Sequence, residues 1–288
     1  MNIKAYERIT ERIIALLQQG TVPWHKPWRV KTHLPRNLIT GKPYRGINVF
    51  LLMAMSYESP DWLTCRQANQ LGGRIKKGEK ACPVVFWKRV KTEDDESSDK
   101  PKKRPMLRLY HVFNMAQCDN LKSALTAEQN GSFQSIEPAS LMAKMPAPPA
   151  IKHGMTMASY SPSEDCILMP DRQRFDGEEA YYATLFHELV HSTGHEKRLK
   201  RPGIVERNGY GSDPYCKEEL VGELGSAFLC GYTGIVERTI DNSASYIEGW
   251  LKQLKDDRTL IVSAAAQAQK AADYILGRTF TESEATNG

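Results

Sequence analysis

The chain has 288 residues, of which 41% are hydrophobic and 25% charged, a balance typical of soluble proteins and sufficient for two domains of ordinary size. It contains no apolar run of about 18 residues, and its first residues lack the apolar stretch of a signal peptide, so we expect neither a membrane span nor export. We therefore expect a cytoplasmic protein whose six cysteines, none in a CxxC pair, are reduced thiols.

The net charge of +5 is unevenly distributed. Residues 1–150 hold 24 Lys and Arg against 13 Asp and Glu, whereas residues 151–288 hold 15 against 21. A basic half joined to an acidic half suggests a different partner for each, and polyanions are the usual partners of a basic domain. An unevenly charged but merely solvated surface is the alternative.

The basic half combines predicted helices with a small sheet. Apolar spacing predicts helices over residues 3–19, 46–56 and 61–72, the last with Asp61 as its cap. Residues 81–90 and 106–115 are rich in strand-forming residues and flank a charged loop, which predicts a two-stranded hairpin. An Ala/Pro-rich segment, 134–150, is the best candidate for an interdomain linker.

The acidic half is predicted to be mostly helical. We expect an exposed or edge strand over Cys166–Met169, because Pro170 stops it. A helix over 176–194 has Asp176 and Glu179 placed as a capping box, and further helices are expected over 217–230 and 245–276. The predicted fold class is α+β, with a mixed helix and small-sheet domain (1–133), a linker (134–150) and a mostly helical domain (151–288).

A metal-binding motif lies within the helix predicted over 176–194. His187-Glu188-Leu189-Val190-His191 has the pattern HExxH, in which residues four apart share one helix face and can point at a single ion. Zn²⁺ is the ion suggested by imidazole ligands with an open position, although Mn²⁺ or another divalent ion could replace it. Glu188 is placed to act as a general base. Two histidines on a helix without a metal are the alternative.

The third ligand is predicted on the following helix. Lys197 occupies the position where a metzincin would have its third histidine, which excludes that spacing. Glu219 is the favoured ligand, with Glu223 four residues later orienting a ligand imidazole, an arrangement that resembles gluzincins. Glu218 and Glu223 remain rivals for the ligand role, and we expect His195 to pack near the site or contact substrate.

Aromatic and cationic residues alternate in the basic half. Bases stack on aromatic rings and phosphates bind cations, so this composition predicts a site for single-stranded nucleic acid without sequence preference. The alternative is that these aromatic residues belong to the core. The candidates are Trp24, Lys26, Trp28, Arg29, Tyr44 and Arg45, together with a Gly-rich turn that holds Arg74, Lys76 and Lys77.

Several longer motifs are distributed over nearly the whole chain: Val-Pro-Trp-His-Lys-Pro-Trp (22–28), Gly-Lys-Pro-Tyr-Arg-Gly-Ile-Asn (41–48), Tyr-His-Val-Phe-Asn (110–114), residues 181–195, Glu-Glu-Leu-Val-Gly-Glu-Leu-Gly (218–225) and residues 263–275. Together they resemble the ArdC antirestriction proteins of conjugative plasmids. The resemblance implies an N-terminal domain that binds single-stranded DNA, a C-terminal zincin-like metallopeptidase domain, and protection of incoming DNA from host restriction. It carries metal binding over to His187 and His191 and the general base to Glu188.

Two functions are compatible with these features. The first is a DNA-binding metallopeptidase whose substrates are host restriction proteins or other DNA-bound proteins. The second is a non-enzymatic shield that coats single-stranded DNA and keeps only a structural or vestigial metal site. A third function, mimicry of DNA by an acidic surface, is disfavoured by the net positive charge.

Overall fold

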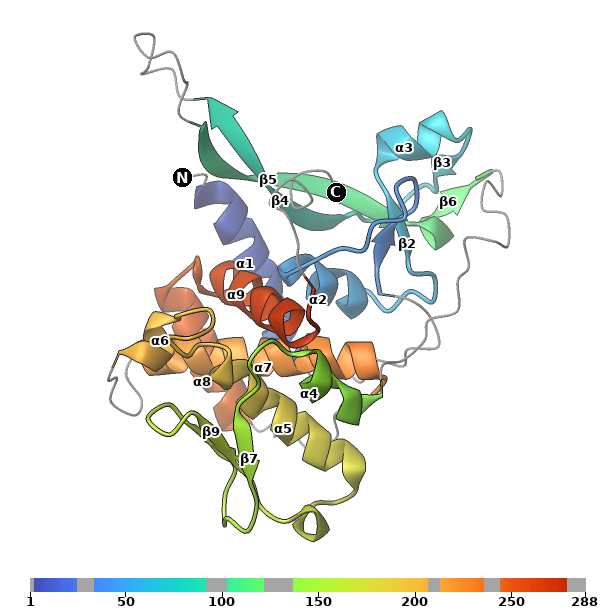
Figure 1. Ribbon diagram of the computed structural model, residues 1–288. Helices are drawn as coiled ribbons and strands as arrows, with labels where there is room; N and C mark the ends of the chain where they lie inside the picture. Colours follow the sequence, from blue (N-terminus) through green and yellow to red (C-terminus); the bar gives the residue numbers. More distant parts are fainter. Residues whose placement is uncertain are drawn as a thin grey trace. The chain divides into compact units, whose positions relative to one another are not determined.

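The computed structural model describes residues 3–24, 34–91, 103–121, 137–206, 213–235 and 244–278. The chain divides into two compact units (Figure 1). The first unit comprises residues 1–15, 32–132 and 280–288, and the second comprises residues 16–31 and 133–279. Both contain helices and strands, which confirms the α+β prediction. None of the described helices is long and apolar enough to cross a membrane.

The first unit is built around a four-stranded sheet with the strand order β1-β2-β5-β4. Strands β1 and β2 are parallel, and the other neighbours are antiparallel. A separate antiparallel pair joins β3 to β6. The elements of this part of the chain are α1 (Ile3–Gln18), β1 (Arg36–Asn37), α2 (Ile47–Ala54), β2 (Asp61–Leu63), α3 (Cys65–Gln70), β3 (Arg74–Ile75), β4 (Cys82–Lys91), β5 (Lys103–Asn114), η1 (Met115–Gln117) and β6 (Cys118–Asp119).

Strands β4 and β5 form the hairpin that the sequence predicts, with β4 shifted by one residue from the expected 81–90 and β5 beginning three residues before the expected start at 106. Their register pairs Val85 with Leu109 and Phe86 with Arg108. The Asn48 side chain on α2 accepts from the Val85 N–H and donates to the Val85 carbonyl, each at 2.8 Å. These two bonds satisfy part of the free edge of β4, which would otherwise offer unpaired backbone groups.

The helix predicted over 61–72 begins later than expected. Asp61 starts strand β2 instead of capping a helix, and its carboxylate accepts from Arg36 Nε at 2.7 Å. The cap of α3 is Thr64, whose side chain and backbone exchange bonds with Gln67 in a capping box. Because Thr64 caps the helix, the residues before it do not belong to the helix. Trp62 and Leu63 pair with β5 instead.

The second unit consists of a small sheet and a group of packed helices. Helix α7 packs against both α5 and α9 (Figure 1), and the interior is filled by buried residues such as Phe186 and Phe228. Its elements are η3 (Pro138–Ser140), α4 (Leu141–Lys144), β7 (Ala150–Lys152), β8 (Ser159–Ser161), β9 (Cys166–Leu168), η4 (Arg172–Arg174), α5 (Glu178–Ser192), α6 (Pro202–Val205), α7 (Asp213–Thr233), α8 (Ala244–Asp256) and α9 (Leu260–Ile275).

Strand β9 was predicted at the edge of a sheet, and this prediction is wrong. It is the central strand, parallel to β7 and antiparallel to β8, and Cys166 and Ile167 are buried. Pro170 ends the strand without limiting its pairing. The segment predicted as a linker also differs, because residues 138–150 form η3, α4 and the start of β7, with Leu141 buried.

Two helix predictions also need correction. Helix α5 begins after Gly177, which has a φ of 94° and makes no side-chain cap bond, so Asp176 is not the cap. The helix predicted over 245–276 is two helices, α8 and α9. The Asp257 carboxylate accepts from the Thr259 N–H and hydroxyl at 2.9 and 2.7 Å, a local turn that competes with helix continuation.

Candidate metal centre

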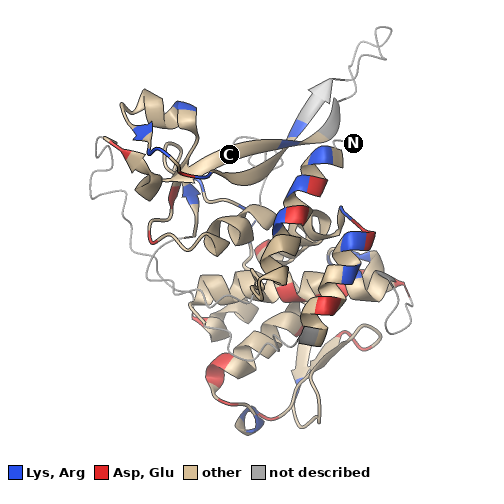
Figure 2. Ribbon diagram, turned by 180° about the vertical axis from the view of Figure 1, so that it is seen from behind, with Lys and Arg blue, Asp and Glu red and all other residues tan. Residues whose placement is uncertain are grey.

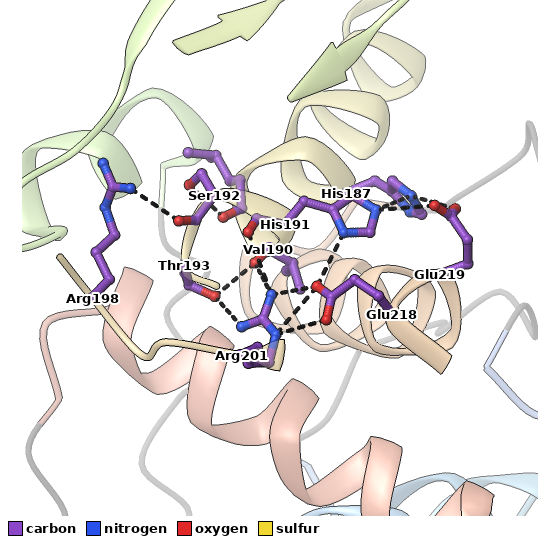
Figure 3. A network of polar contacts seen from close by, with 10 residues as sticks. His187, Val190, His191, Ser192, Thr193, Arg198, Arg201, Glu218 and Glu219 are labelled. Atoms are coloured by element: carbon purple, nitrogen blue, oxygen red, sulfur yellow. Dashed lines mark hydrogen bonds and ion pairs between the residues drawn. The ribbon is translucent and has the colours of Figure 1, made fainter. Parts of the chain in front are cut away.

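Two helices of the second unit bring the predicted ligands together. The spacing along α5 places His187 and His191 on one face, with their Nε2 atoms 3.0 Å apart. From α7, Glu219 lies with its carboxylate oxygens 3.5 Å from His187 Nε2 and 3.7 Å from His191 Nε2 (Figure 3). One donor atom from each residue can be chosen so that all lie within 4.8 Å of one another.

Gly222 allows α7 to approach the two histidines closely. A Cβ atom at this position would lie 2.8 Å from both His187 Cε1 and His191 Nε2, well inside van der Waals contact. Glycine in the middle of a helix costs about 1 kcal/mol relative to alanine, so a structural requirement is expected where one occurs. Here the requirement is room for two imidazole rings beside the helix that supplies Glu219.

A buried ion pair lies behind His191. The Glu218 carboxylate lies 3.2 Å from His191 Nδ1 and accepts from Arg201 Nε and Nη2, the shortest bond being 2.6 Å. Arg201 also donates to the Thr193 hydroxyl and the Val190 carbonyl, at 2.6 and 2.7 Å (Figure 3). A carboxylate that holds Nδ1 of a histidine leaves its Nε2 free to bind a metal.

The donor set fits a divalent cation. Two imidazole nitrogens and one carboxylate oxygen, with room for a fourth ligand, are the set expected at a catalytic zinc site. Burial disfavours a charged His187, but the hydrogen bond to Glu219 and the charges of Glu188, Glu219 and Glu223 raise its pKa to about 9. Burial likewise opposes ionisation of Glu219, yet His187, His191 and Tyr215 lower its pKa. The acids thus create a negative local field that attracts a cation.

The candidate metal centre opens into a cavity of about 990 Å³. Glu188 lines this cavity beside the histidines, as do Tyr215 from the start of α7 and Tyr160 from β8. His195 also lines it, and its Nδ1 accepts from the Lys197 N–H at 3.3 Å. These positions agree with the expected place of His195 near the site.

Asp165 organises the far wall of the cavity. Its carboxylate accepts from both Nη atoms of Arg198, at 2.7 and 3.1 Å, and from the Tyr160 hydroxyl at 2.8 Å. Although partial burial opposes ionisation, these bonds lower the pKa of Asp165. The ion pair therefore fixes Tyr160 on β8 at the cavity wall.

Glu223 was expected to orient a ligand imidazole, and Glu218 is found in that position instead. Glu223 accepts from Trp24 Nε1 at 2.9 Å and also accepts a hydrogen bond from the Tyr246 hydroxyl. The indole of Trp24 is 1% exposed and packs edge-on against Trp250. Trp24 is therefore a core residue of the second unit, and the prediction that it stacks on bases is wrong.

The other predicted nucleic-acid contacts differ in whether their side chains are exposed. Tyr44 is 5% exposed, packs against Phe86 and has its pKa raised to about 12 by burial, so it cannot serve as an open stacking platform. Arg45 is half-buried, whereas Arg74, Lys76 and Lys77 are exposed in the turn around β3. The remaining candidates, Lys26, Trp28 and Arg29, lie outside the described residues.

Three features of the site were missed or left open by the sequence. Arg201 belongs to no recognisable motif, because its partners Val190, Thr193 and Glu218 lie 8 to 17 residues away, further than the spacing of a helical turn or a local cap. Glu218 was considered as a ligand but not as the orienting acid. Gly222 was detectable, since glycine within a predicted helix often marks close packing.

Two segments of the chain match known protein families. Residues 140–267, the segment that contains the candidate metal centre, match the family described as a zincin-like metallopeptidase. Residues 3–113 match the family described as the N-terminal domain of the anti-restriction factor ArdC.

The chain belongs to the ArdC family of antirestriction proteins. It is 38% identical to the metal-free antirestriction ArdC protein of plasmid R388, with a TM-score of 0.75 over 94% of this chain and 96% of that one. The Mn(II)-bound structure of the same protein gives 36% identity and a TM-score of 0.74, over 96% and 99% of the two chains.

Curated relatives include longer proteins. Two Escherichia coli proteins named DNA primase TraC are 37% and 35% identical over 94% of this chain, but the chain spans only 27% and 20% of their lengths. An uncharacterized protein from Sinorhizobium fredii, y4eC, is 34% identical, and the match covers 94% of this chain and 91% of that protein.

Proposed function

We propose that this protein is an antirestriction factor that binds single-stranded DNA through its first unit and carries a gluzincin-like zinc peptidase site in its second. It would protect DNA that enters a cell on a conjugative plasmid, with host restriction proteins or other DNA-bound proteins as substrates. The observation that carries the proposal is the convergence of His187, His191 and Glu219 beside Glu188 in one cavity.

His187, His191 and Glu219 would hold the ion, which supplies Lewis acidity toward a peptide carbonyl when bound. Glu188, 8% exposed at the cavity wall, would accept the proton of the attacking water and return it to the leaving amine. The Tyr215 hydroxyl, whose hydrogen bond to Glu219 helps to lower the pKa of that carboxyl, would turn to donate to the developing oxyanion. Glu218 would keep His191 in the tautomer that presents Nε2 to the cavity.

The decisive experiment replaces the general base. Glu188→Gln keeps the size of the side chain and removes its basicity, so it should retain metal and single-stranded DNA binding while proteolysis falls at least about a thousandfold. Proteolysis is measured on casein and a mixed peptide library, and protection by conjugation into a restricting recipient. His187→Ala serves as the metal-free control, and elemental analysis should find one zinc ion per wild-type chain.

The cellular readout separates the two functions. If proteolysis causes protection, Glu188→Gln loses both. If Glu188→Gln protects transferred DNA as well as the wild type does, the protein acts as a non-enzymatic shield and the peptidase proposal is wrong. A wild-type protein that binds no divalent ion would also contradict the proposal.

A further inference from the structure

The β4–β5 hairpin of the first unit has one face that combines aromatic rings with cations. Phe86 and Lys88 on β4 and Arg108 and Tyr110 on β5 point to the same side, because Phe86 pairs directly with Arg108 and side chains alternate along each strand. Tyr110 is 39% exposed, Lys88 and Arg108 are exposed, and Phe86 is half-buried. We call these four residues the hairpin face.

The opposite side of the hairpin is largely covered by the protein itself. Leu107 on this side is 2% exposed, and Trp87, although 37% exposed, packs edge-on against Tyr6 of α1 with ring centroids 6.4 Å apart. On the side of the hairpin face, the inner residues Val84 and Val112 are buried. The inner end of the hairpin and most of one side thus belong to the core, whereas Lys88, Arg108 and Tyr110 of the hairpin face remain exposed to solvent.

The rings of the hairpin face form part of a continuous row. Tyr44, Phe86 and Tyr110 follow one another with centroid separations of 6.0 and 5.6 Å. Tyr44 is buried at the inner end of this row, and it supports Phe86, which in turn supports the exposed ring of Tyr110. The row therefore fixes the orientation of an exposed aromatic surface at low entropic cost.

The charges on the two strands themselves are of one sign. Strands β4 and β5 each contain three Lys or Arg residues and no Asp or Glu, whereas the segment 92–102 that joins them contains five acidic residues. Figure 2 shows Lys or Arg and no Asp or Glu on the described part of the strands. Arg108 lies directly opposite Phe86 and two residues before Tyr110, so a cation stands beside both rings. Exposed rings flanked by cations match a strand whose unpaired bases offer flat faces and whose backbone carries phosphates.

We propose that the hairpin face is the surface on which the first unit binds single-stranded DNA, with bases stacking on Tyr110 and Phe86 and phosphates contacting Arg108 and Lys88. The inference rests on the proposed function, and it names the residues that perform its DNA-binding part. Duplex DNA is the poorer ligand, since its bases are already stacked on one another.

The turn around β3 is the rival surface, and it provides a charge-matched control. Arg74 and Lys77 are exposed there, but Arg74 Nε lies 3.9 Å from the Asp119 carboxylate. Replacing Arg74 and Lys77 removes the same charge from the same unit as replacing Lys88 and Arg108. Any difference between the two double variants is therefore a difference of position.

The experiment measures binding of the full chain to a labelled oligothymidine of about 20 nucleotides, longer than the site of one binding domain, at several salt concentrations. Tyr110→Leu should weaken binding about tenfold, whereas Tyr110→Phe, which keeps the ring, should stay within about twofold. Lys88→Ala/Arg108→Ala should lower the slope of log affinity against log salt by about 1.4, and Arg74→Ala/Lys77→Ala by less than about 0.5.

Thermal melting of each variant separates loss of a contact from loss of the fold. Tyr110→Leu with the wild-type melting temperature and weakened binding supports the proposal. Unchanged binding by Tyr110→Leu and Lys88→Ala/Arg108→Ala overturns it and leaves the proposed function intact. A wild-type chain that does not bind the strand overturns both this inference and the DNA-binding part of the proposed function.

Discussion

The two units differ in how their candidate functional residues are held. In the second unit, the candidate metal centre rests on two long helices and a buried polar network, so each side chain has several partners that fix it. In the first unit, the hairpin face is open to solvent, and its cations lie on the surface. A metal needs donors fixed within a few tenths of an ångström, whereas a flexible strand tolerates adaptable contacts.

Because of this difference, substitutions in the two units should affect different properties of the protein. Changes beside the candidate metal centre should disturb folding and metal binding together, because the supporting groups are buried. Changes on the hairpin face should alter DNA binding and leave stability nearly unchanged, because exposed substitutions usually shift the free energy of unfolding by less than about 0.5 kcal/mol.

The largest expected effect is that of Arg201→Leu. Arg201 is 5% exposed and holds the Glu218 carboxylate, so its removal leaves a buried charge without its main partner. The free energy of unfolding should fall by about 3–5 kcal/mol. The measurement is urea denaturation with chelator present, followed by tryptophan fluorescence, because Trp24 and Trp250 lie in the second unit.

Arg74→Leu is the matched control for this comparison. It makes the same chemical change at an exposed position of the first unit and should shift stability by no more than about 0.5 kcal/mol. Similar losses for Arg201→Leu and Arg74→Leu would remove the proposed contrast between a rigidly supported centre and a solvated surface.

The second expected effect is on metal affinity. Gly222→Ala places a Cβ atom 2.8 Å from both ligand imidazoles, which must rotate away, so affinity for Zn²⁺ should fall about 10- to 100-fold. Affinity is measured by competition with a chromophoric chelator. Gly249→Ala on α8 is the control, because a Cβ there meets nothing within 4 Å. It should stabilise its helix by up to about 1 kcal/mol and leave metal affinity unchanged.

The same contrast explains what the sequence could predict. His187 and His191 are brought together by the helical repeat alone, so their meeting is predictable without knowledge of the fold. Which of three acids on α7 faces the rings depends on how α7 packs against α5 at Gly222. The orienting role of Glu218 depends on Arg201, a partner that no local pattern indicates.

Helices and strands with strong local sequence signals were also predictable. The pairing of strands and the exposure of aromatic side chains were not. The hairpin and most helices follow from strand-forming residues, apolar periodicity and glycine stops. The central position of β9 depends on β7 and β8, which lie on either side of it. Trp24 and Tyr44 have the composition of a stacking site but lie in the core, because burial of a ring is decided by tertiary packing.

The smallest expected effect concerns Trp24, and it tests which unit this residue serves. Trp24→Phe keeps a ring and removes the hydrogen bond from the indole to Glu223, so stability should fall by about 1–2 kcal/mol. Affinity for single-stranded DNA should stay within about twofold of the wild type, because the ring is buried.

Tyr246→Phe removes the second donor to the same carboxylate oxygen of Glu223. A double-mutant cycle of Trp24→Phe and Tyr246→Phe should show coupling of at least about 0.5 kcal/mol. The opposite result, a tenfold loss of DNA affinity at unchanged stability, would return Trp24 to the DNA-binding surface and break the distinction between the two units.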